Sequence, residues 1–515
     1  MGQYTVTKDL EHNRQIFSDI FSDCADIKMV PMQLGQNEQL SCMVSYIEVV
    51  ASAADYGSSQ IGKLLGTLAG YDGEDISGFL TENSRGMTDV QMYMDLEDAA
   101  AGLLTGDLIL FVDGVDRVFK IPDQGYPGMG VQETESEKVT RGSNEGFSDS
   151  VKTNTALIRK RLRATELKNV EQKVGRRTST LVNLMYMQGI ARMEVLDEIR
   201  QRLSRFEIDG ILDSGMLEQL TERHWTSPFP QFQTTERPDR AVHALLEGRI
   251  VLLCDNSPAA LILPTDCNAF MQTSDDYYNR PQIVTLERIV RYLAAFFALS
   301  LPALYLAVIN FHTGLLPTSM LLTFAQARVG VPFSSLAELL LMEFGFELLR
   351  EAGVRVPGTM GNTIGIVGGL IIGTAAVDAG LASPVVVIIV AFTALCSFAM
   401  PNEAFATAFR LLKFVLILLS AWLGLFGYLL GMLALLIHLS GLYSFGVPYL
   451  MPFAASGIED GAQWRDSIVR YPLFMLNRRP VYAKKSNRIR FRWQHNREEH
   501  AEDDDDAEHR PGQNN

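Results

Sequence analysis

The sequence predicts an α/β soluble region of two related subdomains, followed by an α-helical membrane domain with four to six spans. Three observations predict this organisation. Residues 1–285 mix short apolar runs with charged residues, as soluble α/β chains do. Residues 286–455 contain several apolar runs long enough to cross a bilayer. Residues 456–515 are strongly charged, so the net charge of −15 averages over parts that lie in different solvents.

Two subdomains are predicted at 28–140 and 165–285, because each contains a similar hairpin. The stretches LILFVDGVDRVFKIP (108–122) and IVLLCDNSPAALILP (250–264) both read as strand, turn and strand. Asp113-Gly114 is a strong hairpin signal, since glycine adopts positive φ without strain, whereas Asp255-Asn256 is a weaker one. The alternative is a coincidence between two common hairpins.

Residues 141–164 are predicted to form a basic connector helix between the subdomains. Ser148 can cap this helix, and one of its faces collects Lys152, Arg159 and Arg163. That face is either solvated or docks on an acidic surface or a neighbouring subunit.

The sequence carries no pattern typical of an enzyme or a metal site. Residues 1–27 are expected to be an N-terminal extension without the apolar core of a secretory signal. The five cysteines form no CxxC pair, and the eight histidines have no ligand spacing. Walker A, GxGxxG, GxSxG and triad-like patterns are missing, as is a basic stripe interleaved with aromatics in the soluble region. We therefore expect no catalysis, no cofactor and no nucleic-acid partner.

The apolar region predicts an even number of membrane spans. Candidate spans lie at 289–311, 361–382, 383–401 and 414–447. The last run is long enough for two spans hinged near Gly427 to Gly431, and a short segment between Pro317 and Pro332 could enter the bilayer without crossing it. There are then six spans if 336–352 also crosses, or four if that segment and one other do not.

Both ends of the membrane domain are predicted to be cytoplasmic, because both are basic. Arg280, Arg288 and Arg291 flank the beginning of the first span, and ten Lys/Arg residues lie between Arg465 and Arg497. The tail is predicted in two parts. Residues 456–497 are basic with interleaved aromatics and suit an anionic leaflet, whereas the acidic residues 498–515 should be disordered.

The stretch LLLMEFGFELLREAGVRVP (339–357) carries charges within an apolar segment. On a helix, Glu343, Glu347 and Glu351 share one face, and Arg350 lies beside Glu347. Charges at membrane depth are costly, so they face water or a partner. Together with Glu338, these residues are predicted to line a cation-attracting vestibule or to form a subunit contact. The alternative is an interfacial helix with its charges among the headgroups.

Glycines recur every four residues in the next segment, at Gly361, Gly365, Gly369 and Gly373. Such a stripe lets two helices approach closely, within one subunit or between subunits. Packing is therefore the predicted role of the stripe, and a sliding pore helix is the alternative.

Five ordered blocks together resemble the A subunit of the GerA family of bacterial spore germination receptors. They are RGSNEGF…TNTALIRKRLR, PFPQF…TERPD, LLEGRIVLLCDNSPAALILP, LLLMEFGFELLREAGVRVP and IGIVGGLIIGTAAVDAGLASPVVVIIVAFTAL. The motif residues assigned to coupling or assembly are Arg141, Gly142, Glu145, Gly146, Phe147, Arg159, Arg163, Thr235, Glu236, Arg237, Pro238 and Asp239. Two blocks depart from the usual pattern, with Ser143-Asn144 in place of Pro-Arg and Asn256-Ser257 in place of Gly-Thr.

The resemblance implies a location and an activity. Members of the family sit in the inner membrane of the dormant spore, with the N-terminal domain and the tail on the core side. They work with a transporter-like, nutrient-binding B subunit and a lipoprotein C subunit. The A subunit is expected to form a homo-oligomer of five copies and to conduct monovalent cations when nutrient binds. The alternatives are a non-conducting scaffold or signal-transducing subunit, and an accessory channel without partners.

Overall fold

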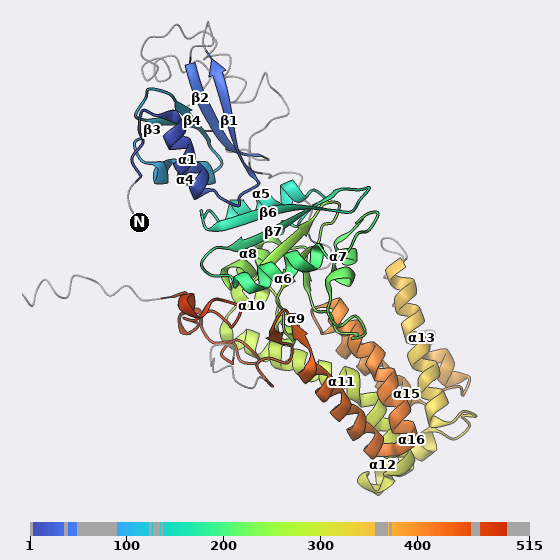
Figure 1. Cartoon of the computed structure of the whole chain (residues 1–515). Helices are drawn as coiled ribbons and strands as arrows, with labels where there is room; N and C mark the ends of the chain where they lie inside the picture. Colours follow the sequence, from blue (N-terminus) through green and yellow to red (C-terminus); the bar gives the residue numbers. More distant parts are fainter. Residues whose placement is uncertain are drawn as a thin grey trace, which may run out of the picture.

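The computed structural model describes residues 4–34, 40–48, 90–122, 126, 134, 137–355, 369, 373–454 and 464–491. Figure 1 shows two sheet-containing subdomains followed by a helical domain, with the C-terminal tail returning to the junction between them. The expected α/β region and helical region are therefore both present.

The first subdomain is built on a five-stranded antiparallel sheet with the order β1-β2-β4-β5-β3. Its elements are α1 (Leu10–Ile20), β1 (Ile27–Leu34), β2 (Leu40–Ile47), β3 (Gln91–Tyr93), α4 (Leu96–Leu104), β4 (Leu108–Val112) and β5 (Val118–Ile121). Helix α1 lies within the segment that we expected to be an extension. That expectation is wrong, because Phe17 of α1 is fully buried and its ring packs 5.0 Å from Phe111 of β4.

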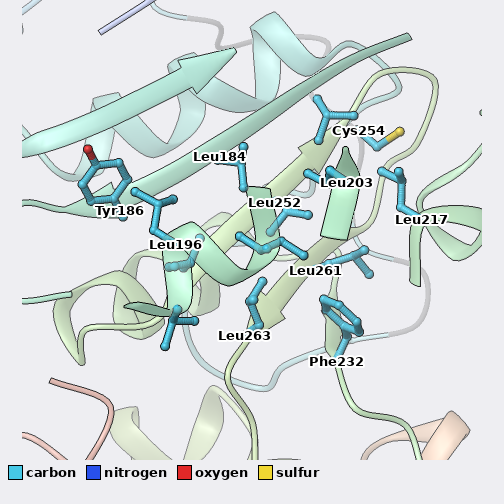
Figure 2. Packing of buried hydrophobic residues seen from close by; sticks show 14 of the residues in the cluster. Leu184, Tyr186, Leu196, Leu203, Leu217, Phe232, Leu252, Cys254, Leu261 and Leu263 are labelled. Carbon is cyan, nitrogen blue, oxygen red and sulfur yellow. The ribbon is translucent and has the colours of Figure 1, made fainter. Parts of the chain in front are cut away.

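The second subdomain repeats this topology, with the strand order β6-β7-β9-β10-β8. Its elements are α5 (Val151–Arg161), β6 (Leu167–Val174), β7 (Thr180–Met187), α6 (Met193–Leu203), α7 (Ser214–Thr221), β8 (Gln233–Thr235), α8 (Pro238–Leu246), β9 (Ile250–Cys254) and β10 (Ala260–Leu263). Strand β9 is buried along its whole length, which explains its continuous apolar sequence. Helices α6 and α7 cover one face of this sheet, and Figure 2 shows their leucines packed against β7, β9 and β10.

Local hydrogen bonds repeat in the two subdomains as well. The side chain of Asn13 binds the backbone of Thr7, and that of Asn154 binds the backbone of Ser148, six positions earlier in both cases. Ser148 is thus not the helix cap that we expected, because Ser150 caps α5 instead.

The hairpin aspartates have the same role in each repeat. Asp113 accepts a hydrogen bond from the first amide of α1, and Asp255 accepts one from the first amide of α5. The residues that follow both have positive φ, 79° at Gly114 and 64° at Asn256. Asparagine tolerates this conformation better than most residues, so Asn256 keeps the turn that the family pattern builds with glycine.

The short helices α9 (Cys267–Met271) and α10 (Asp275–Tyr278) connect the second subdomain to the helical domain. The helical domain contains α11 (Pro281–Phe311), η1 (Thr313–Leu315), α12 (Thr318–Ala327), α13 (Ser335–Arg355), α15 (Pro384–Phe398) and α16 (Glu403–Gly441). A two-stranded sheet and a tail follow, with β11 (Tyr443–Ser444), β12 (Val447–Pro448), η2 (Leu473–Met475) and η3 (Lys485–Asn487).

Two helices in the described part of the chain are long and apolar enough to cross a membrane. They are α11 and α16, each with a mean hydropathy of 2.1 over its best window. By this criterion the expected four to six spans are not confirmed. Helix α15 is shorter, at 15 residues, and α13 is interrupted by charges.

Helix α16 is broken at Gly424, where φ is 62° and ψ is −141°. Its two parts lie side by side, because a side chain at Gly431 would meet Leu416, which precedes the break. The hinge that we expected at Gly427 to Gly431 is therefore misplaced. Gly427 and Gly431 instead allow the two parts to approach, since a Cβ at Gly427 would lie 2.1 Å from the carbonyl oxygen of Leu419.

Candidate functional site

The charged residues of α13 occupy three different environments. Glu338, at the beginning of the helix, is fully buried. Its carboxylate accepts hydrogen bonds from the backbone amide of Ser383 at 2.6 Å and from the Ser383 hydroxyl at 2.5 Å. Arg328 supplies the opposite charge at 3.6 Å. Glu338 therefore fixes the beginning of α15 against α13 with charge-assisted hydrogen bonds.

Glu343 and Glu347 share one partner from another helix. The ammonium group of Lys413, in the first part of α16, lies 2.6 Å from Glu343 and 3.8 Å from Glu347. The side chains of Lys413 and Glu343 are only 4% and 1% exposed. The two glutamates reach the same lysine because residues four apart lie on one face of a helix.

The pairing continues along the helices toward the soluble region. Arg350 binds Glu347 at 3.2 Å and Glu403 at 2.7 Å, and Arg410 binds Glu403 at 2.8 Å. We call Glu343, Lys413, Glu347, Arg350, Glu403 and Arg410 the charge ladder. It contains three acids and three bases, so it is neutral as a whole, and it joins α13 to the beginning of α16.

Glu351 lies outside the ladder. Among the residues that the structure describes, it pairs with Arg355 of its own helix, and both side chains are more than half exposed. An exposed pair of this kind contributes less than about 1 kcal/mol, whereas removal of one partner from a buried pair costs about 3–5 kcal/mol. The predicted face of glutamates is therefore divided between a buried ion network and an exposed pair.

The structure places Glu338, Glu343 and Glu347 against bases of the same chain rather than against open solvent, whereas Glu351 remains more than half exposed. One carboxylate oxygen each of Glu343 and Glu347 has no hydrogen-bond partner among the described residues. Sequence reasoning missed Lys413 and Arg410, although two bases three residues apart at the beginning of a long apolar run were an available signal.

The glycine stripe is only partly described. Gly361 and Gly365 lie outside the described residues. A Cβ at Gly369 would meet nothing within 4 Å, and one at Gly373 would make an ordinary contact with Val387 at 3.6 Å. These two glycines therefore make no close helix approach within the described part of one chain.

A buried ion cluster closes the junction between the soluble region and α11. Arg288 is fully buried and binds Asp276 at 2.8 Å and Asp466 of the tail at 2.9 Å, while Arg291 binds Asp276 at 2.9 Å. Burial alone would raise the pKa of Asp276, but the charges of Arg288 and Arg291 outweigh it and lower the pKa. We expected Arg288 to orient the chain as a free positive charge, but its charge is neutralised inside the protein.

Two motifs far apart in the sequence meet at the second subdomain. The guanidinium of Arg237, 1% exposed, binds Asp239 at 2.8 Å and donates to the carbonyl oxygen of Ser143 at 2.8 Å. The amide of Phe147 donates to the carbonyl oxygen of Glu236 at 2.7 Å, and both Phe147 and its neighbour Gly146 are buried.

The remaining motif residues support the same contact. Thr235 donates to Glu137, and Pro238 occupies the first turn of α8. Gly142 has φ 132°, and a Cβ there would lie 3.0 Å from Tyr278. Glu145 binds Lys160 at 2.7 Å and also Arg161, while the backbone amide of Arg141 donates to Asp275. The two motifs thus hold the segment before α5 against α8 and α10.

Arg159 connects the two subdomains. Its side chain is fully buried, and two of its nitrogens bind the two carboxylate oxygens of Asp26, at 2.8 and 3.2 Å. Burial alone would raise the pKa of Asp26, but Arg159 lowers it below its ordinary value. Lys152 likewise binds Glu48 at 2.6 Å, whereas Arg163 is exposed. The basic face of the connector therefore docks largely on acidic residues of the first subdomain.

Part of the described tail is buried against the soluble region and cannot contact a lipid leaflet. Tyr482 is buried, donates a hydrogen bond to Asp266 at 2.5 Å and packs under Arg249, whose guanidinium lies 4.0 Å from the ring centroid. Ala483 packs so closely on Gly248 that a Cβ at Gly248 would lie 2.8 Å from its α-carbon. The second half of the tail is thus part of the soluble region.

Within the residues that the structure describes, no three His, Cys, Asp or Glu side chains gather in a way that could hold a metal ion. The five cysteines are buried thiols.

Comparison with known proteins gives a consistent result. The family model described as Bacillus/Clostridium GerA spore germination protein matches residues 15–482. Spore germination protein KA of Bacillus subtilis (strain 168) is 37% identical over 469 residues, which cover 90% of this chain and 85% of that protein. Spore germination protein A1 of the same organism is 40% identical over 371 residues, which cover 72% and 76%.

A third relative in Bacillus subtilis (strain 168), the uncharacterized membrane protein YfkQ, is 37% identical over 485 residues, which cover 94% of this chain and 93% of that protein. The crystal structure of the N-terminal domain of the A subunit of the Bacillus megaterium spore germinant receptor GerK3 is 30% identical to this chain. It covers 51% of this chain and 98% of its own, with a TM-score of 0.40. On the family match and these identities, the chain belongs to the GerA family of spore germination proteins.

Proposed function

We propose that the chain is the A subunit of a nutrient-responsive germination receptor and that its helical domain forms a gated path for monovalent cations. Family membership supports the role in germination. The observation that carries the cation path is the charge ladder, because charged side chains buried between apolar helices mark ion paths in membrane proteins.

The contacts between helix ends support six crossings. Ser335 at the beginning of α13 binds Asn310 near the end of α11, and Phe311 packs against the break at Gly424. These residues mark the end of the helical domain that is distant from the soluble region. Helix α13 then returns, since Arg350 binds Glu403 at the beginning of α16.

Helix α15 also begins at the distant end, because Ser383 binds Glu338. Helix α13 thus ends beside the soluble region and α15 begins at the distant end, and most of the chain between them lies outside the described residues. The two parts of α16 supply two crossings, since His438 near its end binds Ser227 of the soluble region. With α11, α13 and α15 this gives five crossings among the described helices. Because α11 begins and α16 ends beside the soluble region, the total number is even, so we propose six and assign that side to the spore core.

The ladder suggests how the path is held closed. The ammonium group of Lys413 lies between Glu343 and Glu347, where a mobile cation would otherwise sit. Separation of α13 from α16 would withdraw this tethered cation and free two carboxylates for potassium or sodium ions. A nutrient bound to a transporter-like B subunit would favour the open state by its differential affinity, and a lipoprotein C subunit would complete the receptor. We place the path in a ring of copies, with five as the expected number.

Potassium release from loaded liposomes tests the proposal. The purified chain is reconstituted alone and with its B and C partners, and release is followed after nutrient is added. Release that falls by at least tenfold in Glu343→Gln/Glu347→Gln but not in Glu351→Gln supports the path, because Glu351 lies outside the ladder. Equal release from both variants would remove the ladder from the conduction mechanism.

A scaffold or signal-transducing role is the second candidate, and one observation favours it. Every charged group of the ladder already has a partner of opposite sign in the same chain, so the ladder is complete without a mobile ion. A receptor that binds nutrient but releases no potassium would support the scaffold. Release from the chain without any partner would instead support an accessory channel.

A further inference from the structure

The first part of the described tail, residues 464–475, exposes an unusual amount of apolar surface. Its exposed large side chains are Trp464, Val469, Tyr471, Leu473, Phe474 and Met475. Trp464 is 54% exposed and Leu473 is 55% exposed, and no residue of η2 is buried. Several large apolar side chains exposed within one short segment of a folded protein are typical of a contact with a lipid or another protein.

This surface is joined to the first membrane helix. The Trp464 ring packs on Phe453 at 5.6 Å between centroids, and Phe453 packs on Tyr292 of α11 at 5.9 Å. The backbone amide of Arg470 also donates to Thr285 of α11 at 3.1 Å. Figure 1 shows the tail beside the beginning of α11.

Helix α11 continues the apolar surface on its own exposed side. Leu286, Val290 and Leu293 are each more than half exposed. Tyr292 follows the ion cluster of Arg288 and Arg291 and precedes the apolar part of the helix. Aromatic side chains are enriched at this depth, where a membrane helix passes from water into hydrocarbon.

The charges of the tail favour an anionic surface. Asp466 is the one acidic residue in the stretch 464–491, and it points inward to Arg288. Arg465, Arg478 and Lys485 are exposed and basic. Exposed lysine and arginine next to a membrane helix are attracted to anionic headgroups by about 1 kcal/mol each.

We propose that residues 464–475 rest in the headgroup region of an anionic leaflet, with the Trp464 indole at the boundary between headgroups and acyl chains. The second half of the tail cannot join them there, because Tyr482 and Ala483 are buried against the soluble region. The tail is then a bridge that fixes the soluble region, the beginning of α11 and the membrane surface relative to one another. This inference goes beyond conduction and holds for a scaffold as well.

Depth-dependent fluorescence quenching in nanodiscs tests this placement in the full chain. Three of the four tryptophans are replaced by phenylalanine, at 225, 422 and 493, so that Trp464 is the sole emitter. We expect lipids brominated near the headgroup to quench Trp464 at least twofold more than lipids brominated near the methyl end. A matched protein that retains only Trp225, 80% exposed in the soluble region, should show no quenching.

Three outcomes are decisive. Quenching of Trp464 that is strengthened by anionic lipid, and weakened by Arg465→Gln, supports the proposal. Quenching of Trp464 no greater than that of Trp225 overturns it. A blue shift of Trp464 emission that appears only when the partner subunits are added would also overturn it, because the surface would then bind a protein. Circular dichroism of each variant shows that the fold is retained.

Discussion

Lys413 is a buried lysine in the helical domain that forms ion pairs with two glutamates of another helix. Its ammonium group is almost fully buried and lies within 4 Å of two glutamates of α13. A buried ion pair adds little net stability compared with well-packed apolar side chains, but the loss of one partner leaves an uncompensated charge. Lys413 thus holds α13 against α16 through two ion pairs, and loss of its charge removes both at once.

We predict that Lys413→Met destabilises the helical domain by about 3–5 kcal/mol, because Glu343 would remain buried without its partner. The measurement is unfolding in detergent micelles with increasing denaturant. The double variant Glu343→Gln/Lys413→Met removes both charges and should recover most of the loss, whereas Glu351→Gln should change stability by less than about 1 kcal/mol. A Lys413→Met protein as stable as the wild type would show that the pair is not buried.

Asp26 predicts a pH dependence in the soluble region. Its folded pKa is lowered by Arg159, so its contribution to stability is fully present above the unfolded pKa of about 3.9. That contribution is lost as the pH falls through the lower, folded pKa. We expect Asp26→Asn to lower stability by about 3 kcal/mol at pH 7, since Arg159 stays buried.

The check is the unfolding of wild type and Asp26→Asn between pH 7 and pH 3. The difference in the free energy of unfolding between the two proteins should stay constant above about pH 5 and become smaller below about pH 4. If this difference in unfolding free energy is unchanged across the whole pH range, Asp26 does not form an ion pair with Arg159 in the folded chain.

At the scale of secondary-structure elements, the main feature of the helical domain is the break in α16 at Gly424. It turns one long apolar helix into two neighbouring parts, and it needs glycine at 424 for two reasons. The backbone there has positive φ, and a Cβ would lie 2.9 Å from the side chain of Phe311. Gly427 and Gly431 then let the two parts approach each other.

We predict that Gly424→Ala destabilises the helical domain by about 1–3 kcal/mol through backbone strain, with a further loss from the contact with Phe311. Gly441→Ala is the matched control in the same helix. A Cβ at Gly441 meets nothing within 4 Å, so the control should be neutral or slightly stabilising. Equal thermal stability of the two variants in micelles would contradict the break.

The sequence predicts the elements better than it predicts their contacts. Asp113-Gly114 indicates a hairpin because the turn chemistry is local, and the structure has that hairpin between β4 and β5. Lys413 and Glu343 are 70 positions apart, and their pairing depends on how two helices pack, which no local pattern encodes. The hinge was misplaced for a related reason, since Gly424, Gly427 and Gly431 look alike in sequence but have different neighbours.

At the scale of the whole molecule, two subdomains of the same topology are joined to the helical domain by a buried ion cluster. Arg159 fastens the first repeat to the second, and Arg288 fastens the second to α11 and the tail. We therefore expect movement of the soluble region to be transmitted to α11 through these buried ion pairs. The acidic partners of these arginines are Asp26 and Asp276. Neither aspartate belongs to a motif that can be recognised in the sequence.

The expected ring of copies predicts a specific behaviour of the glycine stripe. Gly369 makes no close contact within the described part of one chain. We expect such a small-residue stripe to pack against another copy. We predict that Gly369→Leu reduces the oligomer severalfold in native mass spectrometry without lowering the thermal stability of the monomer. An oligomer of unchanged size and abundance would exclude this stripe from the subunit contact.

The most direct test of the central claim is potassium release from liposomes that contain the wild-type chain or Lys413→Met, in the absence of nutrient. The account predicts release at least tenfold faster from Lys413→Met, because the tethered cation between Glu343 and Glu347 is gone. It predicts slow release from the control Glu343→Gln/Lys413→Met, in which the carboxylate next to that position is also removed. Release from Lys413→Met as slow as from the wild type, in protein shown to be folded, would contradict a cation path that the ladder holds closed.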